Sequence, residues 1–305
     1  MNRLICILGP TATGKTSLAS HLAALIGAEI ISADSRQVYA GMDIGTGKDI
    51  GDYTVGGVEV PYHLIDIKEP GYEYNVFEYQ NDFVKAYKKI IANEKIPILC
   101  GGSGMYLDSI LRAYEMNKVP ENKALRTELQ QMPDKQLSDM LNGLQNLHNT
   151  SDTTSRARMI RAIEVAKANK ANLDTMNLLK SLRSINFGIL FDRQTIRERI
   201  TERLVQRLEN GMLDEIGHLL EKGVSKDELL FYGLEYKFLT RYVSGDISYD
   251  EMFDGLNTAI HQFAKRQMTW FRRMQKQGVR LNWIDGNLSM EEKISLILNV
   301  VSKVS

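Results

Sequence analysis

A glycine-rich segment near the amino terminus has the residue types of a phosphate-binding loop (P-loop). Residues 9–16 follow the apolar run 4–8 and precede a helical pattern that extends to residue 26. Glycines let this loop turn tightly, so that its amides and the N-terminus of the next helix converge on an anion. Lys15 would reach the terminal phosphate, and the Thr16 hydroxyl would ligate Mg²⁺. The residues of the predicted phosphate or diphosphate site are Gly9, Pro10, Thr11, Ala12, Thr13, Gly14, Lys15 and Thr16.

An aspartate and a second glycine-rich turn follow the next two predicted strands. Asp34 comes after the predicted strand 29–32, where it could act as a general base, serve as an indirect Mg²⁺ ligand or cap the segment that follows. Residues 101–103 read Gly-Gly-Ser after the predicted strand 96–100, and they would let backbone approach a ligand or begin a helix. Because the carboxyl ends of parallel strands meet at one edge of a sheet, we expect both groups beside the P-loop.

The charged residues are unevenly distributed, although the formal net charge of the 305-residue chain is zero. Acidic side chains dominate residues 41–82, whereas Lys and Arg dominate residues 155–207 and 261–280. Trp270 and Phe271 lie in the second basic stretch, where they could stack on bases or belong to the core. Such stretches fit a polyanionic partner such as nucleic acid, and they also fit solvated helix faces.

The spacing of apolar residues predicts the elements that hold these groups. The amino-terminal third alternates β-rich and helical runs, which is typical of an α/β fold with a parallel sheet flanked by helices, here of the P-loop NTPase-like kind. Residues 121–183 contain no convincing strand and carry apolar residues at helical spacing, which predicts a helical insertion. We expect a catalytic core domain of residues 1–120 plus 184–305, interrupted by the insertion domain of residues 121–183.

The later elements of the core can also be placed from the sequence. A strand is expected to return to the sheet at residues 186–191. After it, helices are expected at residues 194–209, 212–221, 232–244 and 249–276. A short strand is expected at residues 279–284, followed by a final helix from residue 289.

The composition indicates a soluble globular protein, with 43% hydrophobic and 25% charged residues. No apolar run approaches the roughly 18–20 residues that span a bilayer, so we expect no membrane partner. A cleaved signal would remove the P-loop strand, so we expect a cytoplasmic protein, and we expect it to be a monomer. Cys6 and Cys100 lie in apolar strand-like runs and are predicted to be buried thiols. Residues 62–66 are predicted to form a strand in which His63 has a hydrogen-bond partner.

Seven segments, in order along the chain, carry a resemblance to a known family. They are residues 9–16, 31–43, 62–66, 101–106, 158–165, 244–252 and 265–272. The P-loop alone would be shared with many kinases, but Asp-Ser-Arg-Gln-Val-Tyr at 34–39 and Lys-Arg-Gln-Met-Thr-Trp at 265–270 are far more specific. On these segments the chain resembles the bacterial tRNA dimethylallyltransferases, P-loop isopentenyltransferases that act on tRNA.

The resemblance implies a reaction and its participants. A dimethylallyl group would pass from dimethylallyl diphosphate to the N6 amine of adenosine 37, next to the anticodon, in tRNAs that read codons beginning with U. Asp34 would be the general base, Lys15 and Mg²⁺ on Thr16 would take up charge on the leaving diphosphate, and Ser103 would bind the diphosphate or the base. The residues implied to contact the tRNA anticodon stem-loop are Asp34, Ser35, Arg36, Gln37, Ser103, Arg126, Arg158, Met159, Ile160, Arg161, Lys265 and Arg266.

Two departures from the family pattern fall in regions expected to face RNA or to form a lid. Residues 153–155 read Thr-Thr-Ser where the family usually has Asn-Asp-Pro or similar. Residues 233–235 read Gly-Leu-Glu where many relatives have Gly-Tyr-Lys or Gly-Tyr-Arg. Both changes put contact details in doubt and leave the predicted chemistry intact.

Three other functions are compatible with parts of the sequence. A small-molecule P-loop kinase would use Asp34 on an acceptor hydroxyl, but we find no lid motif with paired arginines. An adenylate isopentenyltransferase would use the same donor with free AMP, ADP or ATP, and the basic stretch 155–207 favours tRNA instead. A non-catalytic RNA-binding module would leave an intact P-loop, Asp34 and Ser103 without a role.

Overall fold

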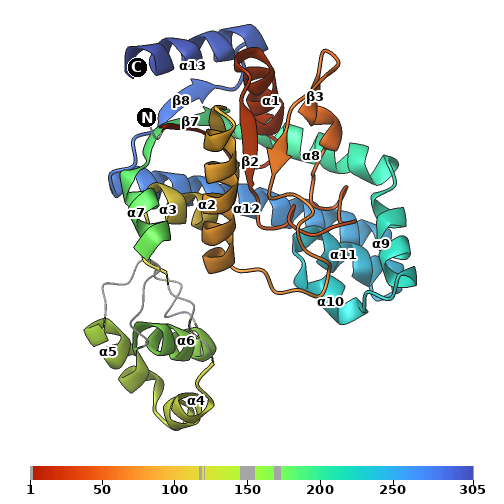
Figure 1. The fold of residues 1–305 in the computed structure, drawn as a ribbon. Coiled ribbons are helices and arrows are strands. Elements are labelled where there is room, and N and C mark those ends of the chain that lie inside the picture. The colour runs from red at the N-terminus through yellow and green to blue at the C-terminus, as the bar shows by residue number, and fades with distance from the viewer. Residues whose placement is uncertain (1–2, 117–118, 120, 145–154, 168–172, 305) are drawn as a thin grey trace. The chain divides into compact units, whose positions relative to one another are not determined.

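The computed structural model describes residues 3–116, 119, 121–144, 155–167 and 173–304 (Figure 1). The chain divides into two compact units. The larger unit consists of Met1–Leu111 together with Ser181–Ser305, and the smaller one is Arg112–Lys180.

A six-stranded sheet forms the centre of the larger unit, and every pairing between neighbouring strands is parallel. The strands, in the spatial order β5-β2-β6-β1-β7-β8, are β5 (Tyr62–His63), β2 (Glu29–Ala33), β6 (Pro97–Gly101), β1 (Arg3–Leu8), β7 (Arg183–Leu190) and β8 (Asn282–Asp285). This sheet confirms the fold class predicted from the sequence, with the P-loop directly after the central strand β1.

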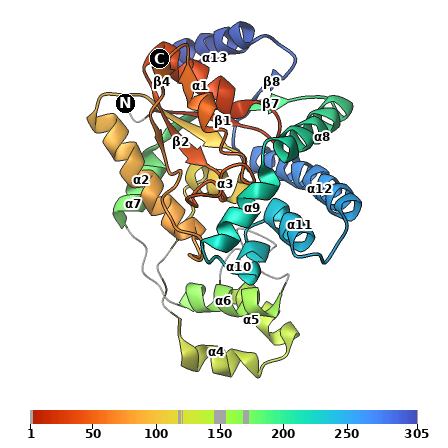
Figure 2. The ribbon, with the colours of Figure 1, turned by 90° about the vertical axis from the view of Figure 1, so that its right-hand side faces the viewer.

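The helices of the larger unit flank this sheet, and those that follow β7 lie together except for the last, which lies near the helix after the P-loop (Figure 2). They are α1 (Lys15–Ile26), α2 (Val76–Ala92), α3 (Gly104–Leu111), α8 (Arg193–Glu209), α9 (Met212–Glu221), α10 (Lys226–Phe231), α11 (Leu234–Val243), α12 (Tyr249–Lys276) and α13 (Met290–Val304). A 3₁₀ helix, η1 (Ile50–Tyr53), leads into a small antiparallel hairpin of β3 (Thr54–Val55) and β4 (Val58–Glu59).

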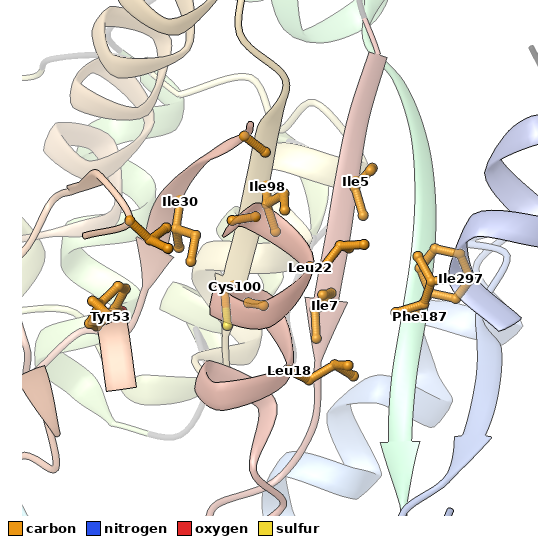
Figure 3. Packing of buried hydrophobic residues seen from close by; sticks show 14 of the residues in the cluster. Ile5, Ile7, Leu18, Leu22, Ile30, Tyr53, Ile98, Cys100, Phe187 and Ile297 are labelled. Carbon is orange, nitrogen blue, oxygen red and sulfur yellow. The ribbon is translucent and has the colours of Figure 1, made fainter. Parts of the chain in front are cut away.

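The main core lies between α1 and the sheet (Figure 3). Ile5 and Ile7 of β1 and Ile98 of β6 pack with Leu18 and Leu22 of α1, and α13 adds to the same cluster. The strand residues that alternate with these are equally buried, so both faces of the sheet are covered. Strands buried on both faces are apolar throughout, which is why the sequence showed them as short continuous runs.

Two smaller predictions about this core are confirmed. Cys6 and Cys100 are free thiols in buried strand positions. His63 lies in β5, and its Nε2 is 2.7 Å from an oxygen of Glu29, so the imidazole has a carboxylate partner.

A second core cluster joins the segment after β2 to the helices α8, α9, α11 and α12. Val38, Tyr39 and Met42 are buried there, and the ring of Tyr39 meets that of Tyr232 edge to face with 4.7 Å between centroids. Burial of these three side chains anchors the backbone that continues from Asp34, and it thereby helps to position the residues that the sequence singles out for chemistry.

The smaller unit is helical in its described residues. Its helices are α4 (Lys123–Gln130), α5 (Asp134–Leu144), α6 (Arg156–Lys167) and α7 (Leu173–Ser181), the last of which ends at the first residue of the other unit. Leu129, Leu137, Leu141 and Ile163 form its fully buried core.

Some predicted boundaries were wrong, and backbone conformation explains two of them. The helix predicted at 232–244 begins only at Leu234, because Gly233 has a φ of 124°. The strand predicted at 62–66 ends at His63, because Leu64 and Asp66 adopt left-handed conformations with φ of 66° and 53°. The hairpin β3–β4 and the six-residue helix α10 were not predicted.

None of the helices formed by the described residues combines the length and the apolar character needed to cross a membrane.

Candidate active site

A cavity of about 600 Å³ is lined by residues that directly follow β1, β2 and β6. The P-loop residues Thr11, Ala12 and 14–16, together with Asp34 and Ser103, contribute to its wall. The three groups that the sequence placed at the carboxyl ends of separate strands therefore meet in one space. Helices α8, α11 and α12 supply further charged residues to the same cavity.

The P-loop is held in shape by its own backbone and side chains. Gly14 is the N-cap of α1 with a left-handed φ of 74°, and Ala12 is also left-handed with φ of 63°. The Thr13 hydroxyl donates a hydrogen bond of 2.8 Å to the carbonyl of Pro10. This arrangement leaves the N-terminus of α1 directed at the cavity, where its dipole favours an anion.

Gln267 on α12 connects the P-loop to the second glycine-rich turn. Its side chain is 6% exposed, accepts a 2.9 Å hydrogen bond from the Thr11 amide and donates one of 2.9 Å to the Gly102 carbonyl. A Cβ atom on Gly102 would lie 2.5 Å from the Gln267 amide nitrogen, so a larger residue there would displace this side chain from its hydrogen bonds. No role was predicted for this glutamine, although it stands in one of the two most specific motifs of the resemblance.

Asp34 and Ser103 are fixed by neighbouring backbone amides. One carboxylate oxygen of Asp34 accepts a 2.9 Å hydrogen bond from the Arg36 amide, as in an Asx turn. The Ser103 hydroxyl accepts from the Ser35 amide at 2.9 Å, and the Ser103 amide donates to the Ala33 carbonyl at 3.1 Å. These bonds orient a carboxylate and a hydroxyl on the same cavity wall.

The Lys15 ammonium lies in an environment that destabilises its positive charge unless an anion is bound nearby. Burial lowers the pKa of Lys15 below its ordinary value, and the positive charges of Arg203 and Arg207 lower it further. A bound polyphosphate would remove this penalty because its negative charge favours the protonated amine. The P-loop lysine is therefore electrostatically prepared for the ligand that the sequence predicted.

Three arginines of α8 line the cavity, and the sequence analysis missed them. Arg199, Arg203 and Arg207 are spaced four residues apart, which places them on one face of the helix. The Arg199 Nε atom donates a 2.9 Å hydrogen bond to the Ala12 carbonyl. Arg203 and Arg207 both form ion pairs with Asp49, the latter at 3.4 Å. Their i, i+4, i+8 spacing within a predicted helix was a signal that could have found them.

A carboxylate on α9 holds the segment that forms another part of the cavity wall. Glu215 accepts hydrogen bonds from the amides of Asp43, Ile44 and Gly45 at 2.8, 2.7 and 3.0 Å. It also accepts one of 2.6 Å from the hydroxyl of the buried Tyr236. The next residues, 45–47, lie on the cavity wall, so this network fixes their position.

The donor set of the cavity fits a divalent metal that arrives with its ligand. Among the described residues no group of three or more His, Cys, Asp or Glu side chains could hold an ion by itself. The Thr16 hydroxyl and the Asp34 carboxylate nevertheless line the space. Mg²⁺ bound to phosphates needs only one or two protein oxygens and keeps several waters, and these residues can supply them.

The residues of α12 predicted to contact RNA lie around two cavities. Arg266 lines the P-loop cavity, whereas Lys265 faces a separate, mainly apolar groove of about 500 Å³. Phe271 is fully buried, so the core interpretation holds for this residue, whereas Trp270 is half-buried with its ring against Gly104.

Asp34, Ser35, Arg36 and Gln37 all line the P-loop cavity. The Gln37 side chain is buried and donates to the Gly47 carbonyl at 3.0 Å, so part of its role is structural.

The arginines of the smaller unit surround a buried carboxylate. Glu164 is 1% exposed and is paired with Arg126 at 2.9 Å and with Arg161. Met159 and Ile160 are buried in the core of this unit, so their side chains support the helix and do not form its outer face. Arg158 is exposed on α6. The departure at residues 153 and 154 lies outside the described residues.

Comparison with known proteins decides the family. Residues 37–274, more than half of the chain, match the model of the IPP transferase family. The chain belongs to the IPP transferase family. Residues 2–63 also match the isopentenyl transferase model. The resemblance seen in the sequence is confirmed.

Relatives of this IPP transferase extend over nearly its whole length. tRNA dimethylallyltransferase 2 of Bacteroides fragilis is 52% identical over 294 residues, which is 96% of each chain. tRNA dimethylallyltransferase 1 of Parabacteroides distasonis is 50% identical over 299 residues, covering 98% of this chain and 97% of the relative.

Solved structures agree with this assignment. The tRNA isopentenylpyrophosphate transferase of Bacillus halodurans has a TM-score of 0.71 at 28% identity, with 99% of this chain and 96% of that chain covered. A eukaryotic dimethylallyltransferase acting on tRNA has a TM-score of 0.76 at 20% identity, covering 99% of this chain and 80% of that one, and shows the shared fold.

Proposed function

We propose that this IPP transferase is a tRNA dimethylallyltransferase. It transfers the dimethylallyl group of dimethylallyl diphosphate to the N6 amine of adenosine 37 in tRNAs that read codons beginning with U. The observation that carries the proposal is the single cavity that contains the P-loop lysine, Asp34 and Ser103. Relatives about 50% identical over nearly the full chain, named tRNA dimethylallyltransferases, support the choice of reaction.

The P-loop binds the donor through its diphosphate. Lys15, the N-terminus of α1 and the arginines of α8 face the same cavity and present positive charge to it. When the allylic carbon–oxygen bond breaks, the negative charge that develops on the diphosphate is stabilised by these groups. Bound on Thr16 and the diphosphate, Mg²⁺ would neutralise part of the same charge.

Asp34 is the general base of the transfer. The new bond joins N6 of the adenine to the allylic carbon, the diphosphate departs with the electrons of the broken bond, and the N6 proton passes to the Asp34 carboxylate. The hydrogen bond from the Arg36 amide holds this carboxylate on the cavity wall. Ser103, fixed beside it by Ser35, hydrogen-bonds the base or the diphosphate.

An adenine amine is a poor nucleophile, so alignment with the allylic carbon supplies much of the rate. The base must also leave its stack to enter a cavity of this kind. Arg36, Gln37 and Arg266 line the cavity and are the proposed contacts of the flipped nucleoside.

Two further regions are proposed to hold the anticodon stem-loop. The groove beside Lys265 is also lined by Arg193, Arg197 and Arg272, which can contact phosphates of an RNA strand. In the smaller unit, proposed as the tRNA-binding insertion, Arg158 is exposed on α6, and Arg126 and Arg161 form ion pairs with Glu164.

A transfer assay with two acceptors tests this function. The full chain is incubated with Mg²⁺, radiolabelled dimethylallyl diphosphate and either an unmodified anticodon stem-loop with consecutive adenosines or free AMP. We expect label in the stem-loop alone, lost when adenosine 37 is replaced by guanosine. Label in AMP would identify an adenylate isopentenyltransferase, and label in neither acceptor would contradict prenyl transfer.

A further inference from the structure

Asp49 is an acidic residue inside a cavity that the proposed function assigns to a polyanion. Its carboxylate forms ion pairs with Arg203 and with Arg207, the latter at 3.4 Å. Burial alone would raise the pKa of Asp49, but these two guanidinium groups hold that pKa below its ordinary value. Asp49 is therefore an anion at the place where positive charge is concentrated.

Arg207 is packed tightly against the backbone of this cavity wall. The Arg207 guanidinium packs over Gly47, where a Cβ atom would lie 2.1 Å from Nη2. Burial and the nearby charge of Arg203 lower the pKa of Arg207, and both arginines also lower that of Lys15. Three cations thus repel one another in one cavity, and Asp49 is an ion-paired partner that reduces this repulsion.

We propose that Asp49 is the internal counter-ion of the diphosphate-binding arginines and competes with diphosphate for them. The inference rests on the proposed function, in which the P-loop cavity binds the donor. When cations displace its last proton, inorganic diphosphate, the product, carries one more negative charge than the prenyl ester, so the same cations hold it more tightly. The charge of Asp49 weakens that hold and favours release of the product.

The substitution Asp49→Asn tests the proposal, with binding of inorganic diphosphate and Mg²⁺ measured by titration calorimetry. Asn is suitable because residue 49 has a left-handed φ of 41°, which Asn tolerates. Removing one negative charge beside the site should tighten diphosphate binding roughly tenfold. Unchanged binding would overturn the proposal, because it would show that Asp49 has no effect on the ligand. Weaker binding would also overturn it, because it would show that Asp49 holds the arginines in a position that favours binding.

Asp52→Asn is the matched control. Asp52 lines the same cavity and loses the same charge, but the ion pairs of Arg203 and Arg207 are with Asp49. We expect its diphosphate affinity to change by less than about twofold, since the closer charge dominates. Equal tightening in the two variants would overturn the specific role of Asp49 and leave only a general field effect.

Lys15→Ala separates failure of this inference from failure of the proposed donor site. Diphosphate binding that survives Lys15→Ala unchanged would place the ligand outside the P-loop and overturn both. Binding that is lost in Lys15→Ala but unaltered in Asp49→Asn would overturn the counter-ion role alone.

Discussion

The carboxylate of Glu215 offers the sharpest test of how the fold shapes the cavity. One of its oxygens accepts from the amides of Asp43 and Ile44, and the other accepts from the amide of Gly45 and the hydroxyl of Tyr236. Glu215→Gln keeps the shape of the side chain and removes its charge. The segment held by Glu215 continues into the cavity wall. Loosening of this segment should therefore increase the hydrogen-exchange rates of its backbone amides and weaken donor binding.

The magnitude follows from the geometry of the four hydrogen bonds. A glutamine can place its amide nitrogen toward the Tyr236 hydroxyl, which can rotate to accept, while the Gly45 amide loses its acceptor. The bonds to Asp43 and Ile44 survive but lose their charge assistance. One lost acceptor and two weakened bonds together cost about 3 kcal/mol of local stability.

Hydrogen exchange of the backbone amides of Asp43, Ile44 and Gly45 measures this loss directly. A cost of about 3 kcal/mol corresponds to roughly hundredfold faster exchange. Tyr236→Phe is the matched control, because it removes one of the four bonds and should accelerate exchange by only about fivefold. An acceleration below about threefold in Glu215→Gln would refute the reasoning that this carboxylate holds the segment.

Three other substitutions have defined outcomes. Burial alone would raise the pKa of Glu164, but hydrogen bonds from Arg126 and Arg161 lower this pKa to about 2. The ionised carboxylate therefore contributes about 3 kcal/mol to the free energy of unfolding above about pH 5, and this contribution disappears as pH falls toward 2. Urea unfolding followed by circular dichroism should show this loss in the wild type and not in Glu164→Gln. Gln267→Ala leaves the Thr11 amide and the Gly102 carbonyl without their partner, so the KM for the donor should rise at least about threefold, and an unchanged KM would contradict a role in shaping the P-loop. Arg158→Gln should reduce the slope of log tRNA affinity against log salt by about one, and an unaltered slope would move the RNA surface elsewhere.

Local patterns were sufficient to predict the centre of this protein. The P-loop, the strands around it and the positions of Asp34 and Ser103 follow from short apolar runs, glycine spacing and the rule that parallel strands share one ligand-binding edge. The long helix α12 was predicted with both of its ends, and the structure shows a capping box of Ser248 and Glu251 at its start and Gly278 just after its last turn.

Contacts between distant segments could not be read in the same way. Glu215 is 170 residues from Gly45, and Gln267 is 256 residues from Thr11, so neither pairing leaves a local signature. The resemblance implied RNA contacts for Arg126 and Arg161, but it gave no sign of the ion pairs that both form with the buried Glu164. The basic character of a stretch predicts a partner only after the internal ion pairs have been identified.

The central claim is that prenyl transfer occurs in the P-loop cavity with Asp34 as the base. The most direct measurement is the single-turnover rate of Asp34→Asn with saturating donor and stem-loop, accompanied by the Kd for tRNA. Asparagine can still accept the hydrogen bond from the Arg36 amide, so local structure is retained while basicity is lost. We predict a rate reduced by roughly 10² or more with tRNA affinity nearly unchanged. A variant that transfers the prenyl group at the wild-type rate would contradict the account.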